Sequence, residues 1–456
     1  MNKGKITPVA WVPTAYFAMG LPFVVVNMVS VLMFDGMGVD SASITFWTSL
    51  ILLPWTIKPL WSPFLELFRT KKFYVVTTQL VTGVAFGLTA LSLTFQDFFA
   101  PAVFFLAIAA FSGATHDIAC DGVYMSELTP TQQARYIGWQ GAFYNIAKIV
   151  ASGGLIYLAG WLIKNNLSSD VSASVGDVIA ANRDAWMIIM GILGMVMFLL
   201  GLYHIFILPG KGLKGEVGNA TADKRGVKEV LCDLWNVLRQ FFTKKYILVY
   251  IIFILLYRFG EGFVVKVVPL FLKASRESGG LGLDTEQIGV YYGTYGAAAF
   301  VAGSLLAGYY ISAFGLKKVL FSLVCAFNIP FVVYALLAWR QPDAGWIIAS
   351  GIIFEYFGYG FGFVGLTLFM MQQIAPGSHQ MAHYAFASGI MNLGVMIPGM
   401  MSGWLADKLG YLAFFIVVML CTIPAFVMSR IVPFRYDDKG KLLEAETSAL
   451  TDNEVL

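Results

Sequence analysis

Charged residues are scarce in this sequence. Lys, Arg, Asp and Glu make up only 12% of the 456 residues, whereas hydrophobic residues make up 58%. Soluble globular proteins are typically about 25% charged and about 45–50% apolar. A chain of this length with so little polar surface would not stay in solution, so the composition excludes a soluble protein and indicates a polytopic membrane protein. The net charge of +3 gives no indication of nucleic-acid binding.

Cysteine is also rare and is not arranged for metal binding. The four cysteines, Cys120, Cys232, Cys325 and Cys421, show no CxxC spacing, and three of them lie in apolar runs. Such cysteines are typical packing residues rather than disulfide partners or zinc ligands. The glycine-rich run 357–365 contains GxG patterns but has no accompanying strand, which excludes a dinucleotide-binding loop. We therefore expect neither a metal nor a cofactor.

Long apolar runs dominate what is present. About 20 apolar residues suffice for a helix to cross a bilayer. Twelve segments meet this length: 9–34, 41–63, 73–95, 98–124, 136–162, 185–208, 246–272, 286–313, 316–339, 344–371, 380–406 and 410–432. No obvious signal-peptide cleavage site precedes or follows the first segment, so we expect it to be an uncleaved span. The predicted fold is all-α, with twelve transmembrane helices.

Positive charge is distributed unevenly between the two sides of the predicted membrane. Twenty Lys and Arg residues fall on the side that carries the termini, six fall on the opposite side and four lie within the spans. Cytoplasmic loops are enriched in Lys and Arg. We therefore expect both termini in the cytoplasm.

The longest charged connection, Pro209–Lys245, divides the spans into six and six. We expect a six-helix bundle at 1–208, a linker at 209–245, a second bundle at 246–435 and a disordered cytoplasmic tail at 436–456. Apolar residues recur at helical spacing in the linker, at Val227, Val230, Leu231, Leu234, Trp235, Leu238 and Phe242. This pattern predicts an amphipathic helix on the inner membrane surface; an ordinary soluble linker helix is the alternative.

A short basic turn occurs at the same place in each half. Glu66–Lys72 follows the second span and Ser312–Lys318 follows the eighth. Matching turns fit two parallel six-helix repeats related by an axis along the membrane normal. The major facilitator fold has this organisation, and its conserved loop lies at this place.

Two acidic residues lie inside the fourth span. Asp117 and Asp121 are four residues apart, so both carboxylates project from one helix face, with His116 beside them. Acidic residues in a membrane span are costly unless they face water, a cation or the protein interior. We therefore interpret this helix as functional. A histidine in a span is more often a hydrogen-bonded packing residue than a titrating one.

Other charged residues of the spans offer partners for these acids. Lys58 lies near the inner end of the second span, at a depth similar to that of Asp121, so the two are candidates to pair. Arg258 and Glu261 are three residues apart on one helix face, where we expect them to neutralise each other.

The remaining charges of the spans fall at two depths. Lys148 and Glu355 lie near the midplane, whereas Lys266 lies towards the outer end of its span, where it is expected to snorkel to the surface. An isolated buried carboxyl group can load a proton, and a nearby Lys or Arg favours its release. Arg258 or Lys148 would suit a carboxylate of a substrate. Together the charges indicate a substrate cavity with a proton relay; buried ion pairs that only pack helices are the alternative.

Several motifs carry a resemblance to a known family. They are Gly20-Leu-Pro22, Leu53-Pro-Trp-Thr-Ile-Lys58-Pro-Leu-Trp61-Ser-Pro63, Ala114-Thr-His-Asp117-Ile-Ala-Cys-Asp121, Leu256-Tyr-Arg258-Phe-Gly260-Glu261, Glu355 and Ser402-Gly-Trp404-Leu-Ala-Asp407. The sequence resembles the AmpG-like muropeptide permeases of the major facilitator superfamily, which are related to acetyl-CoA transporters. It departs from the family pattern at His116, where Gln is usual, at Arg258, where Lys is usual, and at Glu261, where Asp is usual.

The resemblance implies import of peptidoglycan fragments that contain an N-acetylglucosaminyl-anhydromuramyl unit, driven by the proton gradient. It implies functional roles for Lys58, Asp117, Asp121, Glu261 and Glu355. We therefore predict a monomeric, proton-coupled symporter of a bacterial inner membrane that alternates access around a central cavity. Its partners would be a sugar or glycopeptide substrate, protons and the lipid bilayer.

Two other functions remain open from the sequence. One is transport of another solute, such as a different oligosaccharide or an acyl-CoA-like anion; balanced basic and acidic groups in the spans rank it second. The other is a polytopic membrane enzyme. The sequence offers no nucleotide site and no sizeable soluble catalytic domain for such an enzyme.

Overall fold

The fold is taken from a computed structural model of the chain. It describes residues 7–62, 65, 69–128, 130–167, 174–210, 227–377, 379–437 and 442–443. Most of the expected tail and much of the expected linker therefore lie outside the described residues.

Helices account for nearly all of the described first half. Its elements are α1 (Pro8–Val24), the π-helical η1 (Val25–Val29), α2 (Ser30–Gly36), α3 (Ser41–Leu50), α4 (Leu53–Ile57), the 3-10 turn η2 (Lys58–Leu60), α6 (Lys71–Ser92), α7 (Phe99–Glu127), α8 (Pro130–Ile149), the π-helical η3 (Val150–Leu155), α9 (Ile156–Leu167) and α10 (Val175–Ile207). Six expected spans are present here as helical segments.

The second half follows a linker helix, α11 (Val227–Phe242). Its elements are α12 (Ile247–Tyr257), α13 (Phe259–Lys273), the 3-10 turn η4 (Arg276–Ser278), α14 (Thr285–Ile288), the π-helical η5 (Gly289–Tyr295), α15 (Gly296–Phe314), α16 (Leu316–Asn328), the 3-10 turn η6 (Ile329–Phe331), α17 (Val332–Arg340), α18 (Gly345–Phe369), the π-helical η7 (Met370–Ile374), α19 (Gln380–Leu409) and α20 (Tyr411–Ile431). The other six expected spans are helical as well.

Ten helices of the described chain are long and apolar enough to cross a membrane. The second and eighth expected spans are not among them, and the helix of the second is broken. In the second, the chain turns at Ile51 and Leu52 between α3 and α4, and Pro59 follows within η2. Proline removes a backbone donor and clashes with the preceding turn, so it interrupts a helix.

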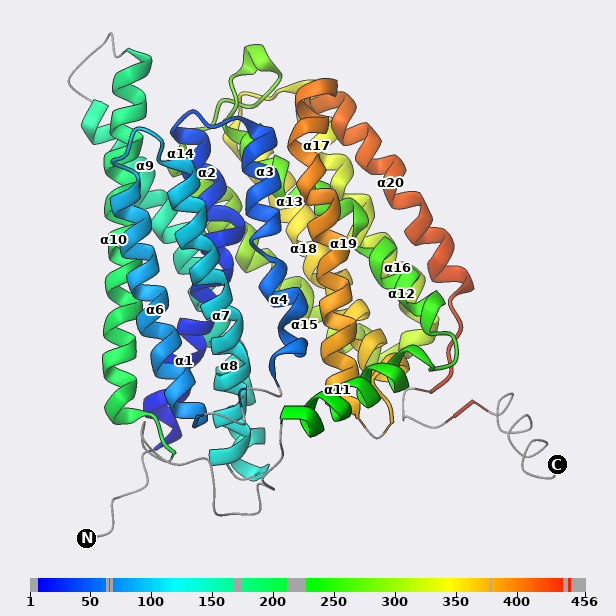
Figure 1. Cartoon of the computed structure of the whole chain (residues 1–456). Helices are drawn as coiled ribbons and strands as arrows, with labels where there is room; N and C mark the ends of the chain where they lie inside the picture. Colours follow the sequence, from blue (N-terminus) through cyan, green and yellow to red (C-terminus); the bar gives the residue numbers. More distant parts are fainter. Residues whose placement is uncertain are drawn as a thin grey trace, which may run out of the picture.

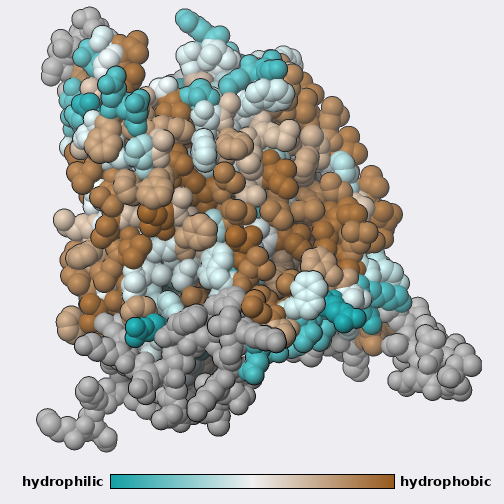
Figure 2. Space-filling view, viewed as in Figure 1, coloured by the Kyte–Doolittle hydropathy of each residue, from teal (hydrophilic) through white to brown (hydrophobic). Residues whose placement is uncertain are grey.

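The helices stand side by side in two groups, one from each half of the chain (Figure 1). In the first group α6 packs against both α7 and α10, and α1 packs against α8; in the second, α18 packs against α15 and α16. Hydrophobic residues cover the middle of the visible face and hydrophilic ones gather at its two ends, as expected for a bilayer-embedded surface (Figure 2).

The linker helix α11 lies across one end of the molecule (Figure 1). We call this end the α11 side and the opposite end the far side. Phe241 of α11 is buried and its ring lies 5.7 Å from that of Phe386 on α19, whereas Leu231, Trp235 and Phe242 are exposed. The predicted helix is confirmed; its placement on the membrane surface stays a prediction.

The two groups pack closely on the far side. Gly403 of α19 lies so near α3 that a Cβ atom would sit 2.2 Å from the Ser41 carbonyl oxygen, and its N–H donates to Thr45 Oγ1 at 3.1 Å. Gly293 in η5 and Ser152 in η3 make a similarly close approach. Small residues at crossing points let helix backbones approach in this way.

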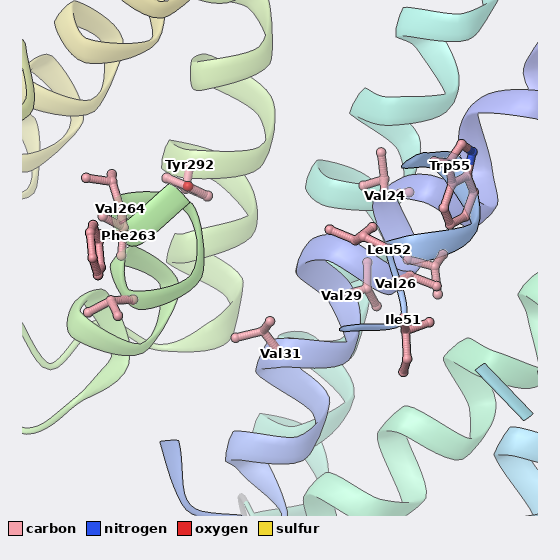
Figure 3. Close-up of a cluster of buried hydrophobic side chains, with 14 of the residues drawn as sticks. Val24, Val26, Val29, Val31, Ile51, Leu52, Trp55, Phe263, Val264 and Tyr292 are labelled. Carbon is pink, nitrogen blue, oxygen red and sulfur yellow. The ribbon is translucent and has the colours of Figure 1, made fainter. Parts of the chain in front are cut away.

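An apolar core lies between the helices of the two groups. Figure 3 shows its labelled members from three places in the chain: Val24, Val26, Val29 and Val31 from α1, η1 and α2, Ile51, Leu52 and Trp55 around the break in the second span, and Phe263, Val264 and Tyr292 from α13 and η5. The core thus includes residues of both halves.

Candidate functional site

Asp117 lies in the middle of a polar contact between α7 and the broken second span. The Lys58 ammonium approaches Asp117 Oδ2 at 3.5 Å, and Trp55 Nε1–H donates to the same oxygen at 3.0 Å. Asp117 is almost buried, whereas the Lys58 side chain remains 28% exposed. The ion pair therefore lies at the edge between protein interior and accessible space.

Asp121 lies one helical turn further along α7 and has different partners. Tyr16 Oη–H donates to Asp121 Oδ1 at 2.8 Å, and Gln140 Nε2 donates to the same oxygen at 3.3 Å. The expected pairing of Lys58 with Asp121 is therefore wrong, because the ammonium lies against Asp117. The expectation assumed an unbroken helix, whereas the break and the 3-10 turn change the depth of Lys58.

A cleft on the α11 side reaches this pair of acids. Lys58 and Asp121 line it from the first half, and Tyr384 and Ser388 of α19 line it from the second. Asp121 thus lies on the wall of this cleft, whereas Asp117 is not among its lining residues.

His116 does not join these acids. It is buried against α6, where its Nε2 lies 2.9 Å from Gln79 Nε2, while Gln79 Oε1 lies 2.8 Å from His204 Nδ1. His204 Nε2 in turn lies 2.9 Å from Thr14 Oγ1. One residue before Asp117 is about 100° away around the helix, so His116 faces another neighbour.

The His116–Gln79–His204–Thr14 chain was not foreseen, because its members come from four separate helices. The available signal was polarity: Gln79 and His204 interrupt otherwise apolar runs. Buried polar side chains are generally hydrogen-bonded. A polar residue in an apolar run therefore predicts that a partner exists, but it does not identify the partner.

Arg258 and Glu261 form the predicted pair. Arg258 Nε and Nη2 donate to the two oxygens of Glu261 at 2.6 and 2.5 Å, and both side chains are buried. This fork-to-carboxylate geometry is the strongest common form of ion pair. The Arg258 guanidinium also lies 5.2 Å from the centre of the Phe363 ring.

Glu355 is buried in α18 and accepts a hydrogen bond from Tyr334 Oη at 2.8 Å. Among the described residues it makes no ion pair. Glu355 therefore has a neutral hydroxyl from α17 as its partner and no basic side chain against it in the described part of the chain.

A second cavity lies between the halves near their middle. It is bordered by α1, η1, α8, η3, α13, η5, α15 and α18. Lys148, Asn27, Tyr292, Tyr356 and Tyr359 are among its lining residues. The Lys148 ammonium lies 4.8 Å from the centre of the Tyr144 ring and 5.7 Å from that of Phe300. Lys148 thus faces a space that residues of both halves enclose.

Lys266 is not at the surface. It is 1% exposed, and its ammonium donates to the backbone oxygens of Asn27 at 3.0 Å and Thr48 at 3.3 Å. The expected snorkelling is wrong because α13 is covered on this face by η1 and α3. Nearer the far-side rim, Lys273 pairs with Asp35 at 2.8 Å. Both lysines connect the second half to the first.

Across the described part of the chain, no group of three or more His, Cys, Asp or Glu residues is placed to hold a metal ion. The buried acids are instead bonded to Lys, Arg, Trp, Tyr and Gln side chains.

Known proteins share this architecture. Residues 14–375 match the model of the Major Facilitator Superfamily. Among solved structures, a D-xylose-proton symporter aligns with a TM-score of 0.69 at 12% identity, covering 96% of this chain and 100% of that one. The nucleoside transporter NupG aligns with a TM-score of 0.63 at 14% identity, covering 92% and 97%. At such identities these structures show the fold alone.

Sequence relatives agree with the resemblance inferred from the motifs. The anhydromuropeptide permease of Escherichia coli K12 is 21% identical over 430 residues, covering 90% of this chain and 77% of that protein. The putative transporter AmpG 4 of Rickettsia felis is 21% identical over 417 residues, covering 89% and 92%. The chain therefore belongs to the Major Facilitator Superfamily, and it is a multi-pass membrane transporter rather than an enzyme.

Proposed function

We propose that this protein is a proton-coupled symporter that imports an amino-sugar-containing muropeptide, disaccharide or related oligosaccharide across a bacterial inner membrane. Residues 1–208 would rock against residues 246–435, exposing the central cavity to each side in turn. The Lys and Arg asymmetry of the connections supports a cytoplasmic position for both termini and hence for the α11 side. The substrate class follows from the permeases that the chain resembles.

One observation supports the coupling: of two carboxylates one helical turn apart, only Asp117 contacts the ammonium of Lys58. While Lys58 contacts Asp117, Asp121 has only neutral partners, Tyr16 and Gln140. Burying an uncompensated carboxylate is costly, and protonation removes that cost. A shift of Lys58 between the acids during rocking would load one and unload the other.

Glu355 supplies a second proton-carrying candidate in the other half. It is buried, and its partner Tyr334 is neutral. Arg258 and Glu261 neutralise each other, and we propose that this pair leaves no net charge on its part of α13 at rest. His116 is proposed to position α7 through Gln79 rather than to carry protons.

The substrate is tested by stabilisation of the full-length protein in detergent. The panel contains an anhydromuropeptide, a chitobiose-type disaccharide, a plain hexose disaccharide and acetyl-CoA. A ligand at about 100 times its dissociation constant adds about 2.7 kcal/mol to the stability of a reversibly unfolding protein. Stabilisation confined to the amino-sugar ligands is expected; stabilisation by hexose disaccharide or acetyl-CoA alone would contradict the proposed substrate.

A further inference from the structure

The basic side chains within the spans differ in whether an acidic side chain neutralises them. Arg258 donates to both oxygens of Glu261, and Lys58 contacts Asp117. Lys266 donates to the backbone oxygens of Asn27 and Thr48. Lys148 lines the central cavity and makes no ion pair within the described part of the chain; its ammonium lies over the Tyr144 and Phe300 rings.

Aromatic faces compensate a cation only in part. A ring face stabilises a cation only weakly, whereas an ammonium withdrawn from water without a counter-ion is destabilised. Lys148 is half-buried and has no acidic partner, and its side chain lines the central cavity, where an anion would supply the missing negative charge. The same cavity contains Asn27, whose buried side-chain oxygen has no hydrogen-bond partner.

We propose that the central cavity binds the acidic group of an anionic substrate, with Lys148 as its counter-ion. The substrate class is a sugar that carries a carboxylate or phosphate, rather than a neutral disaccharide. An anion in the cavity would accept a charge-assisted hydrogen bond from the Lys148 ammonium. The proposal deepens the proposed function and rests on it for the sugar.

The other lining residues of the cavity match the chemistry of the sugar part of such a molecule. Tyr292, Tyr356 and Tyr359 line the wall contributed by the second half, and Asn27 and Asn145 line the wall of the first. Aromatic faces pack on the apolar faces of sugar rings, and amides bond their hydroxyl and acetamido groups. Because Lys148 belongs to the first half and these tyrosines to the second, one bound molecule would contact both moving halves.

The test compares two forms of one ligand on the purified full-length protein. The ligands are N-acetylglucosaminyl-anhydromuramic acid and its neutral carboxamide, with binding measured by titration. The unaltered protein is expected to bind the acid at least about tenfold more tightly than the amide, the effect of one charge-assisted hydrogen bond. Equal affinity for the two would overturn the proposal without any variant.

Variants then locate the preference. Lys148→Gln is expected to abolish it, Lys148→Arg to retain most of it, and Lys164→Gln, an exposed charge change just beyond the end of the same expected span, to leave it unchanged. An acid preference that survives Lys148→Gln would overturn the role of Lys148.

A third arm separates this proposal from the proposed substrate. If only a sugar phosphate or acetyl-CoA binds, and Lys148→Gln weakens that binding about tenfold, the anion site stands and the amino-sugar proposal fails. If the carboxamide and the acid bind equally, the amino-sugar proposal stands and the anion site fails. If none of these ligands binds, both are overturned.

Discussion

At the scale of single residues, the contact between Lys58 and Asp117 is the feature on which the site depends. The carboxylate is nearly buried and the ammonium is partly exposed. Removing either partner leaves the other charge without compensation, whereas removing both leaves no unpaired charge. The energy of the contact is therefore best measured by a double-mutant cycle.

We predict that Lys58→Met and Asp117→Asn each lower the free energy of unfolding by about 1–3 kcal/mol. The double variant should lose clearly less than the sum of the two single variants. Thermal unfolding in detergent measures each change. Lys71→Met, a charge change elsewhere on the same cleft wall, is the control. Strict additivity would show that the two side chains do not interact in solution.

Glu355 gives a second prediction at this scale. In Glu355→Gln the side chain still accepts a hydrogen bond from Tyr334, so the fold should remain intact. If Glu355 carries a coupled proton, uptake driven by a proton gradient should fall to background while substrate exchange across the membrane persists. Vesicle uptake and counterflow, measured on the same preparation, separate the two. Full gradient-driven uptake by this variant would remove Glu355 from the coupling.

Some of these residues were predictable from the sequence and some were not. The shared face of Asp117 and Asp121 and the Arg258–Glu261 pair follow from helical spacing alone, and the structure has both. Tyr16 and Tyr334 lie on other helices than the acids they contact. Only tertiary packing brings such partners together, so periodicity within one helix does not reveal them.

At the scale of elements, the twelve apolar runs predicted every membrane-length helix, because a span needs a long apolar surface. The interruptions were not predicted. The turn at Ile51 and Leu52 and the π-helical η3 and η5 lie within apolar sequence that is compatible with a regular helix. The length of an apolar run indicates whether a segment can cross the bilayer. It does not indicate where the pattern of backbone hydrogen bonds changes within the helix.

The start of α3 supplies a prediction with a pH dependence. Asp40 caps α3 by accepting a hydrogen bond from Ser43 N–H at 2.8 Å, and this bond lowers the pKa of the Asp40 carboxyl below its usual 3.8. A lowered pKa means that the stabilisation is present at neutral pH and is lost as the pH falls below about 3.8.

Asp40→Ala should therefore lower the stability at pH 7 by about 1 kcal/mol. The difference from the unaltered protein should shrink as the pH approaches 3.5. Unfolding curves at both pH values measure this, with the exposed Asp97→Ala as a control that should change little. A difference that grows on acidification would contradict the cap.

The close crossing of α3 and α19 predicts that a larger side chain there separates the two halves on the far side. A Cβ atom at Gly403 would lie 2.2 Å from Ser41 O, whereas at Gly308 no atom lies within 4 Å. Gly403→Leu should push the halves apart on the far side, and Gly308→Leu should not. Spin labels at the exposed Val175 and Trp346, one on each half, report the separation. An unchanged distance distribution in Gly403→Leu would contradict a far-side seal at this crossing.

At the scale of the whole molecule, the two halves are joined by different contacts at different depths. Glycine crossings and two lysines, Lys266 and Lys273, hold the far side together. The α11 side has a cleft that reaches Asp121. This asymmetry is what one state of an alternating-access transporter requires, with the central cavity between the two ends.

Coupling of solute to proton movement is the central claim, and uptake by reconstituted vesicles tests it most directly. The labelled amino-sugar ligand is offered to vesicles with an acidic exterior, with and without a protonophore. A proton-coupled symporter should accumulate the ligand above its external concentration. This accumulation should be lost when the gradient is collapsed and should be absent in Asp121→Asn. Accumulation that is indifferent to the protonophore would contradict proton coupling.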